Sequence, residues 1–359
     1  MRVVVVGASG NAGTGLLRAL HAAPEVTSVV GVSRRRPDLD AEPFRGVEWF
    51  QRDVALEDLT RDGSRERVLV DDLAQVFAGA DAVVHLAWLI QPNRDRELLR
   101  RTNVEGTRHV ALAAAAAGVP HLVVASSVGA YSPVDDDSPR DESWSTGGIP
   151  TSHYSVDKAA QERVLDDVEA AHPEMVVTRL RPALIFQPDA GAEIARYFLG
   201  PLVPRSVLRP GVLPLVPLPT GLRLQVVHAD DVGRAYLAAV LHRDAARGAF
   251  NIAHDQVLRA DELASILDHG RSLGVPPAVL RRLVSIAYDL RLIPTDPGWL
   301  DMAMGAPLMS TGRARSLLGW EPQHSAADTL EDLLHGLASM DGLASPAMQA
   351  TRTSARGQT

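Results

Sequence analysis

Short apolar runs alternate along the first half of the chain with stretches in which apolar residues recur at helical spacing. The runs are rich in valine and lie at residues 3–6, 29–33, 48–51, 82–87, 121–125 and 175–181, the last followed by Pro182. Such runs are typical of parallel strands that are buried on both faces. Helices are expected from Leu16, Leu17 and Leu20 onward and over residues 72–77, 93–117 and 153–171, with a charged loop at 58–72. This alternation predicts an α/β fold with a doubly wound parallel sheet.

In the second half of the chain the alternation of strands and helices is less regular. Six prolines fall between Pro201 and Pro219, and residues 259–305, 313–318 and 326–337 predict amphipathic helices. Strand character returns at 224–228 and 248–252, and Asp230 with Asp231 is expected to cap the helix between them. The sheet domain is therefore predicted to take residues 1–182 and 224–255, and a smaller, mostly helical substrate-binding subdomain to take 183–223 and 256–340. Residues 341–359 are small and polar, which predicts a disordered tail.

Composition narrows the classes of partner. The chain has 359 residues, 46% hydrophobic and 22% charged, with a net charge of -8. An acidic protein is poorly suited to nucleic acid or an anionic membrane, so we expect a small-molecule partner, no nucleic acid and no membrane. The chain lacks cysteine, and its 12 histidines show no HExxH spacing, so no metal is expected. No signal segment or long apolar run is visible, which predicts a cytoplasmic protein.

A glycine-rich turn joins the first strand to the first helix. Its sequence is Gly7, Ala8, Ser9, Gly10, Asn11, Ala12 and Gly13. Glycines with this spacing permit a tight turn, a close approach of a pyrophosphate to the backbone, and close packing of helix on strand. The helix N-terminus attracts the anion. A purely structural turn is the alternative, but the strand and helix on either side favour a Rossmann-type site for a dinucleotide.

The end of the second predicted strand indicates which dinucleotide. NAD binders typically place Asp or Glu there to hold the ribose 2′-hydroxyl. This chain has Ser33 followed by Arg34, Arg35 and Arg36, which leaves space for a 2′-phosphate and neutralises it. NADP(H) is therefore the predicted cofactor and NAD(H) the alternative, although a basic run is also common in solvated loops. Asp53, after the third strand, is positioned to meet the adenine.

The only lysine of the protein is Lys158, and the other 35 basic residues are arginine. Tyr154 precedes it by four residues, so both side chains share one helical face. A neighbouring ammonium favours the phenolate, and we expect it to lower the pKa of Tyr154 toward neutrality, as a general acid or base requires. An exposed helix pair is the alternative. Ser126 and Ser127 end the fifth strand, at the sheet edge where ligands gather.

Taken together, these motifs resemble those of the extended short-chain dehydrogenase/reductases, specifically the NAD-dependent epimerase/dehydratase group, over roughly residues 1–340. The resemblance depends on GASGNAG, HLA at 85–87, NVEGT at 103–107, SSVGAY at 126–131, YSVDK at 154–158, RLRPALIF at 179–186, LQVVHADDV at 224–232 and LGWEP at 318–322. It implies that Tyr154 is the general acid/base, that Lys158 holds the nicotinamide ribose, that Ser127 polarises a carbonyl, and that Asn103 supports a proton-relay water. It also implies cofactor contacts from Val54, Leu86, Ala87 and Pro182, and a homodimer formed through residues 93–117 and 153–171.

Departures from the family pattern narrow the substrate. Sugar-nucleotide dehydratases carry an Asp-Glu pair where this chain has Val128 and Gly129, so dehydration is not expected. After Pro182, nucleotide-sugar enzymes place an asparagine for the diphosphate in a tyrosine-glycine-proline setting, whereas this chain continues as LIFQP at 184–188. Trp88, Trp144 and Phe186 predict a hydrophobic pocket wall, although such residues are more often buried core. His85 is expected to be a hydrogen-bonded residue at a strand end rather than a catalytic one.

The sequence thus predicts an oxidoreductase that moves hydride between NADP(H) and a secondary alcohol or ketone with Ser127, Tyr154 and Lys158. A nucleotide-sugar epimerase that returns the hydride to the same molecule shares this machinery and stays open. A non-catalytic NADP-binding sensor is a further alternative, which the presence of both Tyr154 and Lys158 disfavours.

Overall fold

A seven-stranded parallel sheet forms the centre of the computed structural model, which describes residues 1–56, 63–91, 93–199, 216–268 and 271–349. Its strand order is β11-β6-β5-β4-β1-β2-β3. The strands are β1 (Arg2–Val6), β2 (Ser28–Ser33), β3 (Glu48–Gln51), β4 (Ala82–His85), β5 (His121–Ala125), β6 (Val176–Pro182) and β11 (Gly248–Ile252). The chain leaves β1 toward β2 on one side and reaches β4 on the other. The switch point where such folds bind ligands therefore lies between the ends of β1 and β4.

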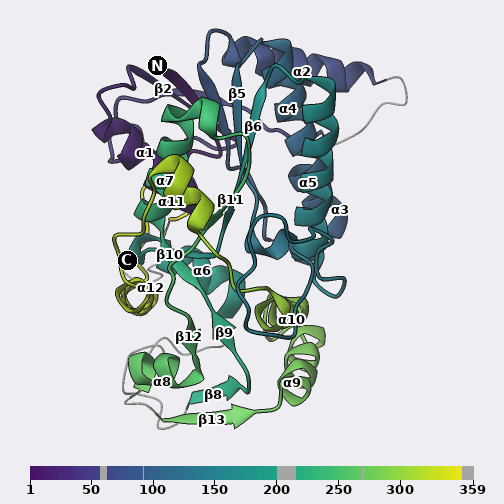
Figure 1. The fold of residues 1–359 in the computed structure, drawn as a ribbon, viewed down its shortest axis with the longest axis vertical. Helices are drawn as coiled ribbons and strands as arrows, with labels where there is room; N and C mark the ends of the chain where they lie inside the picture. Colours follow the sequence, from purple (N-terminus) through teal and green to yellow (C-terminus); the bar gives the residue numbers. More distant parts are fainter. Residues whose placement is uncertain (57–62, 92, 200–215, 269–270, 350–359) are drawn as a thin grey trace, which may run out of the picture.

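Helices cover both faces of this sheet, as expected for a doubly wound fold (Figure 1). One layer contains α1 (Asn11–Ala22), α7 (Ala229–Leu241) and α11 (Gly312–Leu318), and the other contains α2 (Ser64–Phe77), α4 (Gly106–Ala116) and α5 (His153–Ala171). Successive valines of β1 serve both layers: Val3 and Val5 belong to one core, and Val4 and Val6 to the other. Burial on both faces explains why this strand is apolar throughout. The predicted fold class is confirmed.

Two glycines let α1 and α7 touch backbone to backbone. A Cβ atom on Gly15 would lie 2.2 Å from the carbonyl oxygen of Ala229, and one on Gly233 would lie 2.2 Å from the carbonyl oxygen of Gly15. Neither position has space for a side chain. Because α1 follows directly from the glycine-rich turn, this contact fixes the helix that begins at the predicted cofactor site.

Two expected elements differ in the structure. The predicted loop at 58–72 is helical from Ser64, because Leu69, Leu73, Val76 and Phe77 pack toward the sheet while the charged residues face outward; residues 57–62 lie outside the described part. The single helix expected at 93–117 is divided into α3 (Arg96–Arg100), a π-helical turn (Arg101–Glu105) and α4. The wide turn contains Asn103, and π-turns of this kind often occur at functional sites.

The remaining elements form the lower end of the molecule in Figure 1 and the rim above it. The helices there are α6 (Gly191–Ile194), α8 (Ala260–Asp268), α9 (Pro277–Asp289), α10 (Gly298–Gly305) and α12 (Ala326–Ser339), with a π-helical turn at Ala195–Leu199 and 3-10 turns at Val128–Ala130 and Pro188–Ala190. A further 3-10 turn, Arg243–Ala245, joins α7 to β11 at the amino ends of the central strands. Three two-stranded sheets accompany them: β7 (Leu184–Phe186) with β10 (Val226–His228), β8 (Val216–Pro219) with β13 (Ser272–Val275), and β9 (Arg223–Leu224) with β12 (Leu258–Arg259). The predicted helices at 259–305 are present, and β7, β8, β12 and β13 are strands that the sequence did not predict. The domain boundaries stay a prediction.

Two local expectations were wrong. The cap of α7 is His228, whose Nδ1 accepts a hydrogen bond from the backbone N–H of Asp230 at 3.1 Å. The neighbouring Asp231 is fully buried and instead accepts from the N–H groups of Gln323 and His324. The predicted disordered tail is ordered as far as Gln349, because Met348 is buried; residues 350–359 lie outside the described part.

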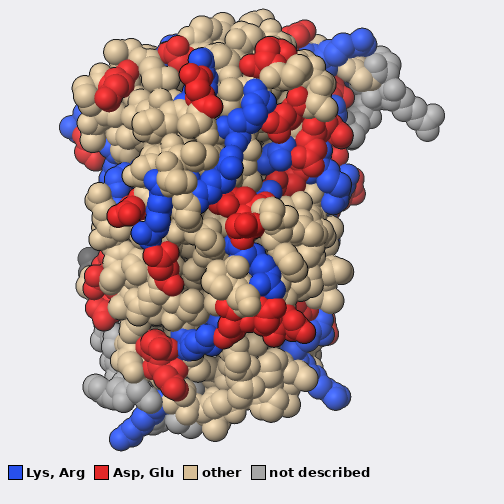
Figure 2. Space-filling view, viewed as in Figure 1, with Lys and Arg blue, Asp and Glu red and all other residues tan. Residues whose placement is uncertain are grey.

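The described surface carries charges of both signs. Figure 2 shows basic and acidic side chains interspersed on the face in view. None of the described helices combines the length and hydropathy that a bilayer span requires. A cytoplasmic location and a homodimer stay predictions.

Candidate active site

A cavity of about 1160 Å³ lies at the carboxyl ends of the central strands. Every residue predicted to bind the cofactor lines it: Gly7, Ser9, Gly10, Asn11, Ala12, Gly13, Ser33, Arg34, Arg35, Asp53, Val54, Leu86, Ala87, Tyr154, Lys158 and Pro182. Of the residues predicted for catalysis or substrate, the lining includes Ser126, Ser127, Trp88 and Phe186. The fold thus brings together residues from β1, β2, β4, β5, α5 and β6.

The glycine-rich turn fits a dinucleotide. Gly7 has a φ of 90°, and a Cβ atom there would lie 2.5 Å from the backbone nitrogen of Ala87; one on Gly13 would lie 2.6 Å from the carbonyl oxygen of Gly7. Packing therefore requires both glycines. Gly10 is different, because the nearest atom to its Cβ position is 3.7 Å away. No side chain caps α1 and no acidic residue lies in its first turn, so its N–H groups are available to a pyrophosphate.

The arginines after β2 surround the place expected for the adenosine ribose. Ser33 is buried, and its hydroxyl donates to the carbonyl oxygen of Arg35 at 2.8 Å. The exposed side chains of Arg34 and Arg35 line the cavity, and so does Arg52, which is paired with Asp72. The end of β2 therefore presents cations and no carboxylate.

The C-terminal segment, residues 345–349, passes over the end of the cavity at which the adenosine ribose is expected. Pro346, Ala347 and Gln349 line the cavity, and the Ser345 hydroxyl donates to the carbonyl oxygen of Ser9, in the glycine-rich turn, at 2.8 Å. Arg35 donates to the carbonyl oxygen of Pro346 at 3.3 Å. A part of the chain that was predicted to be disordered therefore contributes to the predicted cofactor site.

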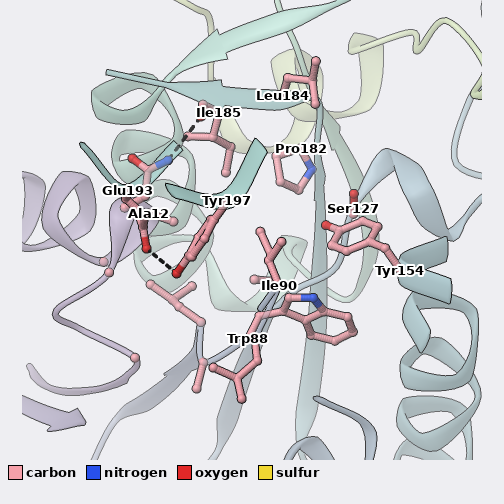
Figure 3. A pocket seen from close by; sticks show the side chains of 18 of the residues that line it. Ala12, Trp88, Ile90, Ser127, Tyr154, Pro182, Leu184, Ile185, Glu193 and Tyr197 are labelled. Atoms are coloured by element: carbon pink, nitrogen blue, oxygen red, sulfur yellow. Dashed lines mark hydrogen bonds between the residues drawn. The ribbon is translucent and has the colours of Figure 1, made fainter. Parts of the chain in front are cut away.

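Tyr154 and Ser127 meet at the centre of the cavity. Ser152 caps α5 and accepts from the N–H of Ser155, which places Tyr154 in the first turn of the helix. Figure 3 shows the hydroxyl groups of Tyr154 and Ser127 turned toward each other. Burial raises the pKa of Tyr154 to about 12, against the opposing effect of the hydrogen bond with Ser127. The tyrosine is therefore a protonated phenol at neutral pH.

Lys158 is buried one helical turn after the tyrosine. Its Nζ donates to the carbonyl oxygen of Ala125 at 2.6 Å and to Oε1 of Gln161 at 3.1 Å, and lies 3.5 Å from the centroid of the Trp88 ring. Burial lowers the pKa of Lys158 well below its usual value, against the charges of Glu162 and Asp157. The expectation that Lys158 lowers the tyrosine pKa was wrong for this structure. The amino group is directed at three other partners, and desolvation dominates the phenol.

A buried hydrogen-bond chain supports the lysine. Gln161 donates through Nε2 to the Thr107 hydroxyl at 3.0 Å, and Thr107 donates to the carbonyl oxygen of Asn103 at 2.7 Å. His85 Nε2 lies 3.0 Å from the same hydroxyl, whose one proton is already used, so His85 is the donor. Burial, with the charge of Lys158, lowers the pKa of His85 to about 3 and keeps the ring neutral. His85 is a hydrogen-bonded residue at a strand end, as expected.

Aromatic rings surround Tyr154. The Trp299 ring lies 4.8 Å from it, the Trp88 ring meets it edge-on at 5.8 Å, and Phe198 contacts Trp299 at 5.0 Å, all between ring centroids. Gly129 makes this packing possible: a Cβ atom there would lie 2.9 Å from Tyr154 and 3.1 Å from the sulfur of Met302. The position where dehydratases carry a carboxylate thus has no space for a side chain. We refer to the three rings of Trp88, Phe198 and Trp299, together with the neighbouring Met302, as the aromatic wall.

The family model for the NAD dependent epimerase/dehydratase family matches residues 3–253. The chain belongs to this family. Its members are enzymes, and the seven-stranded Rossmann-type sheet agrees with that assignment.

Comparison with individual proteins gives more distant likenesses. The chain is 27% identical over 345 residues to an uncharacterised protein of Mycobacterium tuberculosis, covering 96% of this chain but 31% of that protein's length. It is 29% identical to the 3-diazoavenalumate denitrifying reductase of a Streptomyces species, covering 90% of this chain and 97% of the reductase. The structure of dTDP-glucose 4,6-dehydratase from Streptomyces venezuelae, with NAD and TYD bound, has a TM-score of 0.66 at 21% identity, covering 94% of this chain and 97% of the dehydratase. That likeness shows the fold.

Three of the predicted site residues have other contacts here. The Asn103 amide is bonded on both sides to the backbone of Leu89, accepting from its N–H at 2.7 Å and donating to its carbonyl oxygen at 2.9 Å. Its role with a relay water stays a prediction. Ser126 donates to Glu162 at 2.6 Å, so its proton is not directed at a substrate. Trp144 does not line the cavity, because it stacks on Arg140 and donates to the carbonyl oxygen of Ser132.

The sequence also missed residues of this family member's cavity. Trp299 and Met302 reach it from α10, and Phe198 and Glu193 from the segment around α6. Burial raises the pKa of Glu193 to about 7, and Figure 3 shows its hydrogen bond with Tyr197 on the side of the cavity away from Ser127. The sequence indicated only that residues 259–305 form amphipathic helices of the substrate-binding subdomain.

Proposed function

We propose that this chain is an NADP(H)-dependent oxidoreductase that interconverts a ketone and a secondary alcohol. The observation that supports this most is the pairing of the Tyr154 and Ser127 hydroxyls in the same cavity that the glycine-rich turn lines. Membership of an enzyme family agrees with the proposal. The chain spans 31% of the mycobacterial relative, so the proposal concerns the activity of this chain.

In this proposal each polar group has a separate task. The nicotinamide supplies or accepts the hydride. Ser127 donates a hydrogen bond to the carbonyl oxygen, and Tyr154 gives that oxygen its phenolic proton while the carbon–oxygen π bond breaks. The carbonyl oxygen thus gains the proton of Tyr154, and the carbon would gain the hydride that bound NADPH supplies. With a pKa of about 12, Tyr154 carries its proton at neutral pH, and this is the proton that the reductive direction consumes. Lys158, held by Ala125 and Gln161, is positioned to bind the nicotinamide ribose.

The test of this function is the Tyr154→Phe variant. Loss of a positioned general acid is expected to reduce turnover by about 10² to 10⁴-fold while NADPH binding stays intact. Tyr288→Phe is the matched control, because Tyr288 stacks on Arg94 outside the cavity lining. Undiminished turnover in Tyr154→Phe would overturn the proposal and favour the binding-protein alternative. Net consumption of NADPH separates a reductase from an epimerase, which returns its hydride.

The preference for NADP(H) is a separate proposal. It is supported by Ser33, Arg34 and Arg35, which line the cavity where NAD binders place a carboxylate. Dissociation constants for NADPH and NADH measure it directly. Replacing Arg34 and Arg35 together by glutamine is expected to weaken NADPH binding and leave NADH binding nearly unchanged. Tighter binding of NADH by the unmodified protein would contradict this preference.

A further inference from the structure

The half of the cavity beyond Tyr154 differs from the cofactor half in its chemistry. Its lining comes from the aromatic wall, from Leu184 on β7 and from residues 306–309, which are Ala, Pro, Leu and Met. Figure 3 shows Leu184 and Trp88 bordering the space next to Tyr154 and Ser127. Apart from these two hydroxyls, the side chains named here are mainly apolar.

The cations that line this half are already paired within the described residues. Arg223 is buried and donates to Asp137 at 2.7 Å and to the carbonyl oxygens of Val134, at 3.1 Å, and Asp136. Arg196 donates to the carbonyl oxygens of Gln349 at 2.6 Å and Ala347 at 2.5 Å. Arg223 therefore already faces a carboxylate, and these donors of Arg196 are directed at carbonyl oxygens of the C-terminal segment.

The Gln225 amide, which lines this half beside Met309, is also fully used. Its Nε2 donates to the carbonyl oxygens of His254 at 3.1 Å and Met309 at 3.2 Å, while its Oε1 accepts from the N–H of Met309 at 2.6 Å. It has no free donor for a phosphate. Transferring an anion into such surroundings without new partners carries a large desolvation cost.

We infer that the carbonyl or alcohol handled by this site is carried on an uncharged, mainly apolar compound whose rings or alicyclic body lie against the aromatic wall. The inference depends on the proposed function and names its substrate class. Trp299 and Trp88 supply flat surfaces on two sides of Tyr154, so a rigid body in contact with both is held with its oxygen between the Tyr154 and Ser127 hydroxyls. A nucleotide diphosphate would instead meet carbon and paired arginines.

The test compares two sets of candidate substrates at a fixed NADPH concentration. One set contains uncharged ketones: a steroid ketone, an aryl alkyl ketone and a straight-chain methyl ketone. The other contains UDP-glucose and dTDP-glucose, with hexose interconversion followed by chromatography because an epimerase leaves the nicotinamide absorbance unchanged. The expected result is a kcat/KM for the steroid or aryl ketone at least about a hundredfold above that for either nucleotide sugar, the size of effect that unpaired buried charge produces. Comparable or faster turnover of a nucleotide sugar would overturn the inference.

Two tryptophan variants test whether the aromatic wall binds the ketone. Trp299→Ala is expected to raise KM for the preferred ketone about 10- to 100-fold and to leave NADPH binding unchanged, because it removes a large apolar contact. Trp144→Ala is the matched control, since Trp144 lies outside the cavity lining. Equal effects of the two variants would contradict a role for the aromatic wall. Calorimetry with the NADP⁺-loaded protein adds a measurement without turnover, in which UDP binding more tightly than the ketones overturns the inference.

Failure of the inference and failure of the proposed function give different results. If a nucleotide sugar is converted and Tyr154→Phe abolishes that conversion, the hydride-transfer function stands and the substrate class is wrong. If a ketone is reduced equally fast by Tyr154→Phe, the catalytic proposal itself is wrong.

Discussion

The buried ion pair behind the serine turn offers the sharpest test of how the site is held. Arg181 donates to both carboxylate oxygens of Glu162, at 2.8 and 3.1 Å, and Ser126 donates to one of them at 2.6 Å. The side chains of Arg181 and Glu162 are 5% and 2% exposed. Breaking a buried pair by removing one charge costs about 3–5 kcal/mol. For 359 residues the unfolding entropy is about 0.75 kcal/mol per kelvin, so Glu162→Gln is expected to lower Tm by about 4–7 °C.

The pH dependence adds a second measurement. Burial raises the pKa of Glu162, but the hydrogen bond and charge of Arg181 outweigh it and hold the pKa below its usual value. The carboxylate therefore contributes stability above the pKa of the unfolded chain, and this contribution is lost as the pH falls through the folded pKa. The difference in Tm between the wild type and Glu162→Gln should shrink below about pH 4.

A surface pair provides the control. Arg2 and Glu48 lie 3.3 Å apart, with side chains 30% and 54% exposed. Pairs of this kind contribute about 0–1 kcal/mol, so Glu48→Gln should change Tm by little more than 1 °C. If thermal unfolding shows Glu162→Gln to be no more harmful than Glu48→Gln, the assignment of Glu162 as the anchor of the Ser126–Ser127 turn is refuted.

Three further variants test other parts of the site. Gly233→Ala is expected to lower the free energy of unfolding in denaturant by about 1–3 kcal/mol, because its Cβ would overlap Gly15 of α1. Gly312→Ala is the control and should be almost neutral, because the nearest atom to its Cβ position is 3.7 Å away. Met348→Ala removes a fully buried side chain beside Thr14. This variant should lose its C-terminal segment to proteolysis faster and bind NADPH more weakly. An unchanged rate of proteolysis would show that Met348 does not hold the segment. Asn103→Ala leaves the backbone of Leu89 without two partners and should lower kcat/KM about tenfold, with partial recovery in Asn103→Asp, which keeps the acceptor for the N–H.

The sequence predicted the sheet well because each strand is a short apolar run that can be recognised without its neighbours. The valine runs of β1 and β4 and the glycine-rich turn are local patterns, and local patterns fix both the strands and the ligand edge of the sheet. The expected helix at 93–117 was interrupted by a π-turn because the Asn103 side chain is bonded to Leu89, a contact with another part of the chain. No local spacing encodes such a contact.

The far wall of the cavity was unpredictable for the same reason. Trp299 and Phe198 lie on separate segments and become part of one surface only through contact with each other and with Tyr154. Trp144, which lies closer to Tyr154 along the chain, was expected in the pocket and stacks on Arg140 instead. The tail shows the same limit, since small and polar residues gave no sign that Ser345 binds the glycine-rich turn.

The solitary lysine, Lys158, was the most informative residue for finding the candidate active site. The structure changes the physical reason for a lysine at this position. In a chain that otherwise uses arginine, the one lysine lies where Ala125, Gln161 and Trp88 surround its amino group. A planar guanidinium, with five N–H donors in a fixed fork, has no matching set of acceptors there. The lysine therefore fits this position because it is compact, and the tyrosine beside it stays protonated because it is buried. If Lys158 binds the nicotinamide ribose as proposed, the protonated phenol beside it carries the proton that reduction of a carbonyl consumes.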